Sequence, residues 1–204
     1  MNERKEQKTV YQEPLLVIIR GIPGSGKSYL TNDIINKLSI DITIVDPDSI
    51  NKESKTYKEF AHKLRSTEPE VEEKFYPYRF MLQIAHDRLN QKSKPPFVIW
   101  NQAFTDTEGL DYTVRKLKSL CNSQLNILII QLDPHPEEAW KRIQERMQTG
   151  GHGMDSERFN SFVTKYQKIE PQYPNIVVDT FTSYENAVTQ AMDQIKQIWT
   201  KNEN

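Results

Sequence analysis

The stretch Leu15-Leu-Val-Ile-Ile-Arg20-Gly21-Ile-Pro-Gly-Ser-Gly26-Lys27-Ser28 decides the fold of this 204-residue chain. Its first six residues form an apolar run, which is the pattern of a strand buried on both faces. Its last eight residues match G-x-x-x-x-G-K-[ST], the spacing of a phosphate-binding loop that joins a strand to a helix. Leu30, Ile34 and Leu38 follow at helical spacing. The sequence therefore predicts a helix that begins at about Lys27.

Each residue type in this loop has a chemical reason. Glycines let successive backbone N–H groups turn inward around phosphate oxygens, and the helix N-terminus adds the positive end of its dipole. The Lys27 ammonium would reach the β- and γ-phosphates, and the Ser28 hydroxyl would ligate Mg²⁺. We predict that ATP, with GTP as the alternative, is bound by Gly21, Pro23, Gly24, Ser25, Gly26, Lys27, Ser28 and Tyr29. No predicted strand is followed by the guanine-reading N/T-K-x-D motif, which argues against a GTPase.

Composition excludes several classes of protein. At 36% hydrophobic and 27% charged residues, the chain is expected to form one globular domain over 14–200, after a polar tail at 1–13. A net charge of −1 argues against a general nucleic-acid coat protein. The single cysteine, Cys121, excludes an intramolecular disulfide and predicts a reducing compartment. No apolar run is long enough to span a membrane and the charged N-terminus lacks a signal-peptide core, so we predict a cytoplasmic protein without membrane contact.

Apolar runs alternate with helical segments along the chain. The runs lie at 15–20, 42–46, 97–100, 126–133 and 175–179. Such alternation is typical of an α/β fold, here a P-loop NTPase fold with a five-stranded parallel sheet and helices on both faces. Ligands of such sheets bind at the carboxyl ends of the strands. The segments to inspect are therefore 21–28, 46–49, 101–104, 133–136 and 179–180.

Residues 50–93 break this alternation, because they are too long for one crossover helix. A first short helix is predicted from Tyr57, and a second is predicted from Val71, with Pro77 kinking or splitting it. This helical insert either recognises a substrate at the edge of the site or simply covers the sheet. Tyr78, in the second helix, is interpreted as a packing residue, with contact to a base or sugar as the alternative.

Two carboxylates follow the second predicted strand, which we expect to lie next to the loop. Asp46 and Asp48 are two residues apart, so alternation along an extended chain points both to the same side. Asp46 lies deeper, which suits a magnesium-shell or structural role. Asp48 lies further out, where it can accept the proton of an attacking hydroxyl as a general base. The alternative is that both belong to an Asp-Pro-Asp turn without a catalytic role.

Residues 142–158 have the pattern of a lid. Arg142 and Arg146 are four residues apart and share one face of a predicted helix. Two guanidinium groups beside the segment 150–153, which carries three of the seven glycines, suit a lid that closes on the triphosphate and neutralises transition-state charge. The alternative is a solvated basic face. His152 is a catalytic acid, a phosphate contact or, as we favour, a loop residue.

Three blocks, GIPGSGKS, VDPDS and RIQERMQTGGH, together resemble the small P-loop kinases that include the zeta toxins and the polynucleotide kinases, and are most similar to the zeta toxins. The resemblance spans about 15–180. It implies that Lys27 is the P-loop lysine, that Asp48 is the base, and that Arg142 and Arg146 are lid arginines. It also implies ATP- or GTP-dependent phosphorylation of a hydroxyl, which in zeta toxins belongs to a UDP-linked amino sugar.

The chain departs from this family pattern in two places. Beyond the lid histidine, where the family often has several arginines, only Arg158 is found. After the third strand, where the family usually has an acidic residue, the chain has Asn101.

The sequence thus predicts an ATP-dependent, magnesium-requiring phosphotransferase that acts on a small-molecule hydroxyl. A polynucleotide 5′-hydroxyl kinase is the second hypothesis, and the near-neutral net charge speaks against the basic groove that it needs. A nucleotide-binding regulatory module with degenerate catalysis is the third, and Asn101 would suit it. No antitoxin-type protein partner is identified by the sequence.

Overall fold

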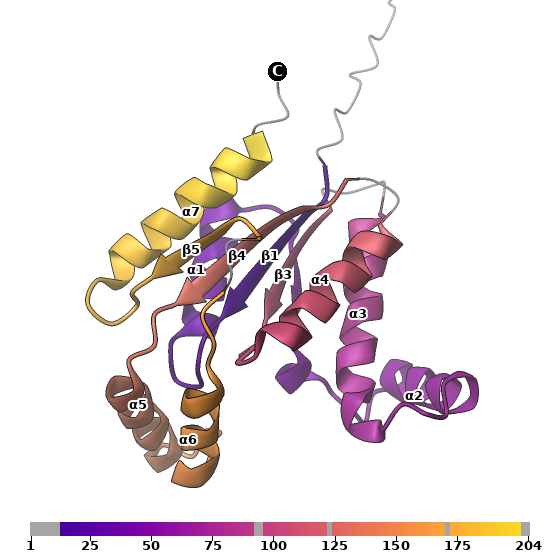
Figure 1. Cartoon of the computed structure of the whole chain (residues 1–204), viewed down its shortest axis with the longest axis horizontal. Coiled ribbons are helices and arrows are strands. Elements are labelled where there is room, and N and C mark those ends of the chain that lie inside the picture. Colours follow the sequence, from indigo (N-terminus) through magenta and orange to yellow (C-terminus); the bar gives the residue numbers. More distant parts are fainter. Residues whose placement is uncertain (1–12, 92–95, 122–123, 170–171, 201–204) are drawn as a thin grey trace, which may run out of the picture.

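The computed structural model describes residues 13–91, 96–121, 124–169 and 172–200, so the predicted polar tail lies outside the described residues except for Glu13. Five strands form one sheet: β1 Leu15–Arg20, β2 Thr43–Val45, β3 Phe97–Asn101, β4 Asn126–Leu132 and β5 Asn175–Val178. They pair in the order β2-β3-β1-β4-β5, and every neighbouring pair is parallel (Figure 1). The predicted α/β fold with a five-stranded parallel sheet is confirmed.

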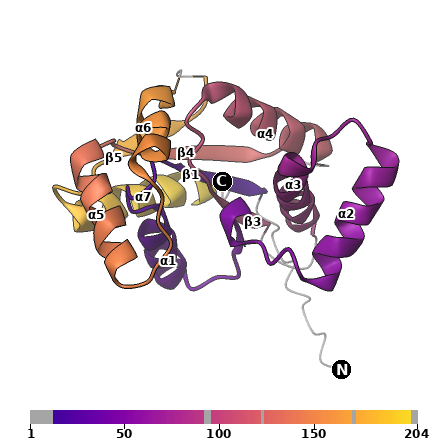
Figure 2. The ribbon, with the colours of Figure 1, turned by 90° about the horizontal axis from the view of Figure 1, so that it is seen from below.

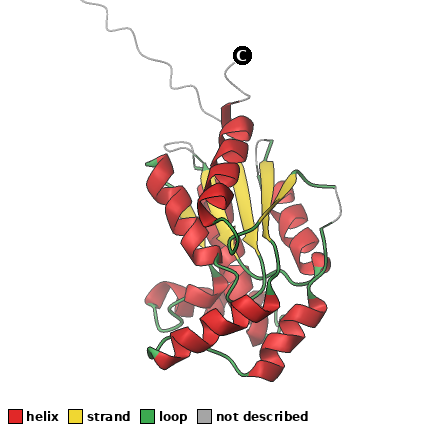
Figure 3. Ribbon diagram, turned by 90° about the vertical axis from the view of Figure 1, so that its left-hand side faces the viewer, coloured by secondary structure: helices red, strands yellow, loops and turns green. Residues whose placement is uncertain are grey.

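Helices cover both faces of the sheet (Figures 1 and 3). The helices are α1 Lys27–Leu38, α2 Lys55–Thr67, α3 Tyr76–Leu89, α4 Thr107–Leu120, α5 Pro136–Gln148, α6 Ser156–Lys165 and α7 Tyr184–Thr200, with short turns η1 Pro47–Ser49 and η2 Glu73–Phe75. Side chains alternate along β1: Val17 and Ile19 pack with residues of α1 and α7, whereas Leu16 and Ile18 pack with residues of α3 and α4. Both faces of β1 are therefore buried, as its continuous apolar sequence predicts.

The strand order corrects one expectation. The second strand follows the phosphate loop in the chain, but β2 does not lie beside β1 in the sheet, because β3 pairs with both. Pairing of parallel strands depends on residues far apart in sequence, so no local pattern reveals it. As a result, Asn101 at the carboxyl end of β3 lies between the phosphate loop and the carboxylate of Asp46.

The insert over residues 50–93 contains α2, η2 and α3. Val71 lies before the second helix, and Pro77 neither kinks nor splits it, because α3 begins at Tyr76 and Pro77 stands in its first turn. A proline is tolerated there because the first N–H groups of a helix have no partner within the helix. The outer half of α3 packs on α2 through a small cluster that includes Tyr57 and Tyr76. The inner half of α3 packs on the sheet, so α3 covers the sheet, whereas α2 projects away from it (Figure 2).

Helices α5 and α6 stand at the carboxyl edge of the strands, across from α2 (Figures 1 and 2). Ile22 of the phosphate loop packs in one buried cluster with Ala139 and Ile143 of α5 and Phe159 of α6. The predicted lid region 142–158 comprises the second half of α5, the segment 149–155 and the start of α6. Within the described residues, no helix has both the length and the apolar composition needed to cross a membrane.

Candidate active site

The loop between β1 and α1 has the backbone shape that its glycines predict. Gly24 and Gly26 have φ angles of 81° and 95°, in the left-handed region that favours glycine. A Cβ at Gly24 would lie 2.3 Å from the carbonyl oxygen of Ala139, so the loop also passes directly against α5. The hydroxyl of Thr180, just after β5, donates a 2.6 Å hydrogen bond to the carbonyl of Ser25. The loop is thus held in place by α5 and by the end of β5.

Lys27 is folded into the loop that it follows. Its Nζ donates to the carbonyl oxygens of Gly21 at 3.0 Å and Ile22 at 3.1 Å. Burial lowers the pKa of Lys27 to about 8; the carboxylates of Asp48 and Asp46 oppose this shift, and the guanidinium of Arg146 adds to it. These couplings mean that Lys27 shares one electrostatic environment with both carboxylates and with the second lid arginine.

The candidate magnesium ligands meet at Asn101. The buried Asn101 Nδ2 lies 3.3 Å from the Ser28 hydroxyl and 3.4 Å from Asp46 Oδ2, and it donates to both oxygens. A hydroxyl and a carboxylate are the hard oxygen ligands that Mg²⁺ takes in phosphate-transfer sites, together with phosphates and water. The residues present therefore fit the ion. The Asn101 amide is thus a hydrogen-bond donor to both of these oxygens.

The two carboxylates after β2 have different surroundings. Asp46 caps η1: its Oδ1 accepts from the backbone N–H of Asp48 at 3.0 Å, and its backbone carbonyl accepts from the Ser49 hydroxyl at 2.9 Å. Burial, the largest influence, raises the pKa of Asp46. Among the described residues, no side chain donates to or pairs with the Asp48 carboxylate. Asp46 is thus fixed within the structure, while Asp48 is exposed and available to an incoming hydroxyl.

The lid arginines make different contacts. The guanidinium of Arg142 lies 3.8 Å from the ring centre of Phe181, and its Nη2 donates to the carbonyl of Thr180 at 3.4 Å. Arg142 Nη1 would also lie 3.4 Å from a Cβ at Gly26. Arg146 instead lies close enough to Lys27 for their charges to repel. Although both arginines are on one face of α5, Arg142 lies over the start of α1 and Arg146 lies near Lys27.

The second glycine segment folds back onto the end of α5. Gly150 donates its N–H to the carbonyl of Met147 at 3.1 Å, and Gly151 donates to that of Arg146 at 2.9 Å. His152 is exposed and makes no hydrogen bond or ion pair with another described residue. Its role as a loop residue, a phosphate contact or a catalytic acid stays a prediction. The remaining predicted nucleotide contacts, Pro23 and Tyr29, lie in the loop and in the exposed first turn of α1.

Sequence reasoning assigned no role to Thr180 or Phe181. Residues 179–180 are candidates because they follow a predicted strand. No sequence motif, however, identifies Thr180 as a residue that bonds to the backbone of the phosphate loop. Thr180 is 2% exposed, and its hydrogen bond links the end of β5 to the phosphate loop. The ring of Phe181 packs against the guanidinium of Arg142. Both are recognised only once the fold brings the end of β5 beside the loop.

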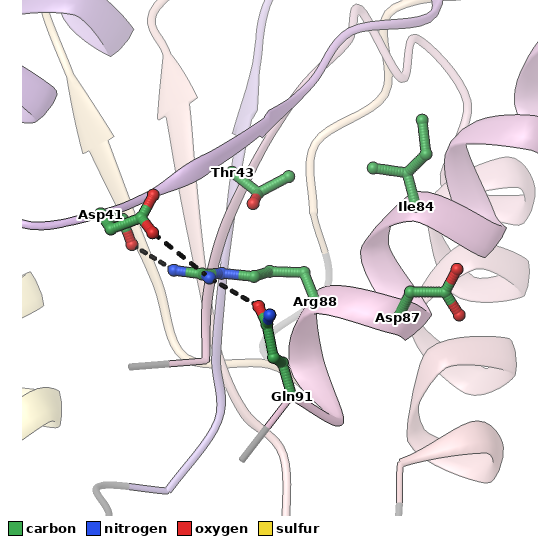
Figure 4. A pocket seen from close by; sticks show the side chains of 6 residues that line it. All are labelled: Asp41, Thr43, Ile84, Asp87, Arg88 and Gln91. Atoms are coloured by element: carbon green, nitrogen blue, oxygen red, sulfur yellow. Dashed lines mark hydrogen bonds and ion pairs between the residues drawn. The ribbon is translucent and has the colours of Figure 1, made fainter. Parts of the chain in front are cut away.

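A separate hollow of about 400 Å³ lies at the opposite edge of the sheet, between the start of β2 and the end of α3 (Figure 4). Its buried Arg88 donates to the Asp41 carbonyl and, at 2.8 Å, to Gln91, and lies 3.6 Å from the Asp41 carboxylate. Asp87 also lines the hollow. Arg88 is thus held by Asp41 and Gln91, and the Asp87 carboxylate lies 3.0 Å from His86 Nδ1, so the Arg88 guanidinium already has its partners and we interpret this hollow as structural.

A parallel sheet in the order β2-β3-β1-β4-β5, with a phosphate loop after its central strand, defines the P-loop kinase fold. The chain belongs to the family described as AAA domain, whose model matches residues 16–169. No curated protein matches the chain in sequence.

Several solved structures are similar to this chain in fold at low sequence identity. A gluconokinase from Sinorhizobium meliloti 1021 is 15% identical, with a TM-score of 0.59 over 92% of this chain and 95% of that one. Kti12 from Chaetomium thermophilum, in complex with ADP-AlF3, is 13% identical, with a TM-score of 0.61 over 91% and 99%. A fungal RNA kinase is 15% identical, with a TM-score of 0.57 over 91% and 87%. At these identities the similarity concerns the fold alone.

Separate effects are expected for the two lid arginines. Arg146→Ala should lower kcat by about 10²-fold with little change in nucleotide affinity, because a cation near Lys27 acts on charge that develops at the transferred phosphate. Arg142→Ala should weaken nucleotide binding by about tenfold and change kcat less, because its contacts hold it against the start of α1. Calorimetry and steady-state kinetics measure the two effects. If both variants lost kcat equally, Arg142 would also be a residue that stabilises charge in the transition state.

Nucleotide binding is expected to take up a proton near pH 8. Lys27 has a pKa of about 8 in the free protein, and bound phosphates favour its charged form, so at pH 8 about half of the molecules should gain a proton on binding. Affinity should fall as pH rises above 8 and level off below it. Calorimetry of Mg·ADP in buffers of different ionisation enthalpy measures the uptake. Lys27→Arg, which stays charged, is the control, and zero uptake by the unmodified protein would contradict the expectation.

Proposed function

We propose that this chain is an ATP-dependent phosphotransferase that moves the γ-phosphate to a hydroxyl of a small molecule, with a zeta-toxin-like nucleotide sugar as the finer form of the proposal. One observation carries it: the Asp48 carboxylate has no hydrogen-bond or ion-pair partner among the described residues, yet it is close enough to Lys27 for its charge to oppose the lowering of the Lys27 pKa by burial. A free carboxylate beside a phosphate-binding lysine is the arrangement that a general base for phosphoryl transfer requires.

The residues divide the reaction between them. The loop N–H groups and Lys27 bind and orient the phosphates, and α5 and α6 shield them from water. Ser28 and Asp46 would hold Mg²⁺, which when bound neutralises charge on the phosphates. As the acceptor oxygen forms its bond to the γ-phosphorus, the bond to the ADP oxygen breaks and Asp48 takes the hydroxyl proton. Arg146 stabilises the charge that spreads over the transferred group.

The contacts of Asn101 support an active enzyme over a regulatory module with degenerate catalysis. An asparagine at position 101 would indicate a catalytically inactive protein if it left Ser28 and Asp46, the candidate magnesium ligands, without a hydrogen-bond partner. Instead, Asn101 Nδ2 donates to both Ser28 and Asp46. This arrangement keeps the hydroxyl and the carboxylate on one side of the loop, where a metal bound to phosphate would need them.

Acceptor-dependent ADP release tests the proposal. The protein is incubated with Mg·ATP and with sugars, sugar acids, sugar phosphates, nucleotide sugars such as UDP-linked amino sugars, or a 5′-hydroxyl oligonucleotide. We expect one small hydroxyl compound to raise ADP release well above background hydrolysis, and Lys27→Ala to remove the increase. Stimulation by the oligonucleotide alone would favour the polynucleotide kinase. Nucleotide binding without transfer to any acceptor would favour the regulatory module.

A further inference from the structure

We propose that Arg20 is a positioning residue for phosphoryl transfer. It holds residues 166–167, which directly follow α6 and which we call the α6 anchor, against the strand that enters the phosphate loop. The lid helices α5 and α6 are thereby kept in place over that loop. This inference rests on the proposed function, and it assigns a role to a residue outside the phosphate-loop motif, the candidate base and the lid arginines.

Arg20 is a costly residue at its position. It ends β1 after five buried apolar residues, its side chain is 0% exposed, and Gly21 of the phosphate loop follows it directly. Within the part of the chain that the structure describes, no carboxylate lies at ion-pair distance from it, and its Nε and Nη1 have no hydrogen-bond partner. Burial of a charge without a counter-charge is unfavourable, and an apolar side chain would avoid it. A role other than local stability is therefore indicated.

The contacts of Arg20 are with the α6 anchor. Its Nη2 donates to the backbone carbonyl of Gln167 at 2.8 Å, and its guanidinium lies 4.5 Å from the ring centre of Tyr166. The Tyr166 hydroxyl donates in turn to the carbonyl of Leu132, the last residue of β4, at 3.3 Å. The chain that leaves α6 is thus bound to the carboxyl ends of two paired strands, β1 and β4.

Gln167 extends this joint to the segment after β3. Its backbone N–H donates to the carbonyl of Thr105 at 2.8 Å. Its Oε1 accepts from the backbone N–H and the hydroxyl of Thr107, the first residue of α4, at 3.0 and 3.1 Å. The same segment contacts the phosphate loop, because the Gly21 N–H donates to the carbonyl of Ala103 at 3.4 Å. The end of β1, the segment after β3 and the α6 anchor therefore meet at one joint.

The lid has a second attachment to the phosphate loop. Ile22 packs with residues of α5 and α6 in one buried cluster, and Tyr166 packs against that cluster. Among the described residues, the hydrogen bonds of segment 149–155, between α5 and α6, reach only these two helices. The attachments at Ile22 and at the α6 anchor thus fix the lid. Loss of the second should let α6, and α5 packed on it, move relative to the loop.

A displaced α5 would change phosphoryl transfer because it bears Arg142 and Arg146. The Nη1 atom of Arg142 would lie 3.4 Å from a Cβ at Gly26, so α5 holds a guanidinium directly over the phosphate loop. A misplacement of about 1 Å can lower a rate about 10²-fold when it shifts groups that act on the reacting atoms. Arg20 is itself buried, so it acts through the lid arginines and not on the phosphates.

Substitutions of two buried arginines test the proposal. Arg20→Met removes the donors and keeps the length of the side chain, and Arg20→Lys retains one donor group. The matched control is Arg88→Met, because Arg88 is also buried and donates to a backbone carbonyl, that of Asp41, at the far end of α3. We measure kcat and KM for ATP with an acceptor that the protein turns over. Circular dichroism melting gives the temperatures at which each variant is folded.

Gln167→Ala tests the same joint without altering a buried side chain. Gln167 is exposed, and the substitution removes the acceptor of both Thr107 hydrogen bonds. Its control is Gln172→Ala, which removes a comparable contact with α4, since Gln172 Nε2 donates to the Asp111 carboxylate at 3.0 Å. Gln167→Ala should lower kcat about threefold or more, whereas Gln172→Ala should leave it unchanged. This variant decides the question if Arg20→Met does not fold.

Arg20→Met should lower kcat about ten- to a hundredfold, change KM for ATP less, and be partly rescued by Arg20→Lys. Arg88→Met should lower the melting temperature but leave kcat unchanged. In a protein that also carries Arg142→Ala and Arg146→Ala, Arg20→Met should lower kcat by less than about twofold further, because the groups through which it acts are gone.

Hydrogen exchange of residues 149–165 gives a readout that needs no acceptor. Saturating Mg·ADP should slow the exchange of these amides in the unmodified protein and in Arg88→Met. The slowing should be about tenfold weaker in Arg20→Met, because the lid is no longer held where it can close on the nucleotide.

Three results would overturn the inference while the proposed function stands. The first is unchanged kcat and unchanged protection in the folded Arg20→Met and Gln167→Ala proteins. The second is an equal loss of kcat in Arg88→Met, and the third is a loss that adds in full to those of Arg142→Ala and Arg146→Ala; both would give Arg20 a general structural role. Absence of transfer by the unmodified protein would instead overturn the proposed function, and hydrogen exchange alone would then decide whether Arg20 holds the lid.

Discussion

Lys27→Ala is expected to abolish Mg·ATP binding or to raise its Kd by about a hundredfold or more, while the fold is retained. The ammonium of Lys27 is the charged donor of the loop, and two charge-assisted hydrogen bonds to phosphate oxygens together account for a loss of this size. Lys27→Ala removes the two hydrogen bonds from Nζ to the carbonyls of Gly21 and Ile22, but the Thr180–Ser25 hydrogen bond and the packing of Ile22 on α5 still hold the loop. Isothermal titration calorimetry measures the loss.

The matched control for this variant is Lys37→Ala, which removes an exposed lysine from the last turn of the same helix. It should bind nucleotide like the unmodified protein. Thermal melting should show little loss of stability in Lys27→Ala, because burial already disfavours the charged form of that side chain. An unchanged nucleotide affinity in a folded Lys27→Ala protein would remove the basis of the proposed function.

Asp48→Asn is expected to lower phosphoryl transfer by about 10²-fold or more and to leave ATP affinity unchanged. Asparagine has the same shape but cannot take the acceptor proton, and a positioned base contributes at least this factor. Asp46→Asn should instead raise the magnesium concentration needed for half-maximal rate, because it removes the charge beside Ser28 and Asn101. Steady-state ADP release with a turned-over acceptor, at varied Mg²⁺, measures both effects.

Asp87→Asn provides the control, since this carboxylate lines the hollow at the far end of α3. It should change neither kcat nor the magnesium requirement. Full acceptor turnover in Asp48→Asn would place the base elsewhere, and His152 would be the next candidate.

Local patterns were sufficient to predict the sheet, the phosphate loop and the first helix. The loop motif, its flanking apolar run and the helical spacing of Leu30 and Ile34 each depend on residues close together in the chain, so the sequence alone identifies them. Strand order does not, because β3 pairs with β1 and β2 through contacts between distant residues. The family departure at Asn101 could therefore be noticed in the sequence, but its hydrogen bonds to Ser28 and Asp46 could not.

In the lid and the insert, too, local sequence predicts some features and only the fold shows the others. Spacing places Arg142 and Arg146 on one helical face, but only the packing of α5 against Phe181 separates their contacts. The sequence predicts a break at Pro77 because a proline usually interrupts a helix, but Pro77 stands in the first turn of α3, where a proline is favourable.

The fate of the γ-phosphate tests the central claim most directly. The protein is incubated with ATP labelled in the γ-phosphate, Mg²⁺ and a small-molecule cell extract, and the labelled products are separated. The account predicts that label appears in an organic phosphate ester that is stable to mild acid, and that Lys27→Ala and Asp48→Asn each suppress its formation. Label that stays in ATP, or that passes only to inorganic phosphate, would contradict it.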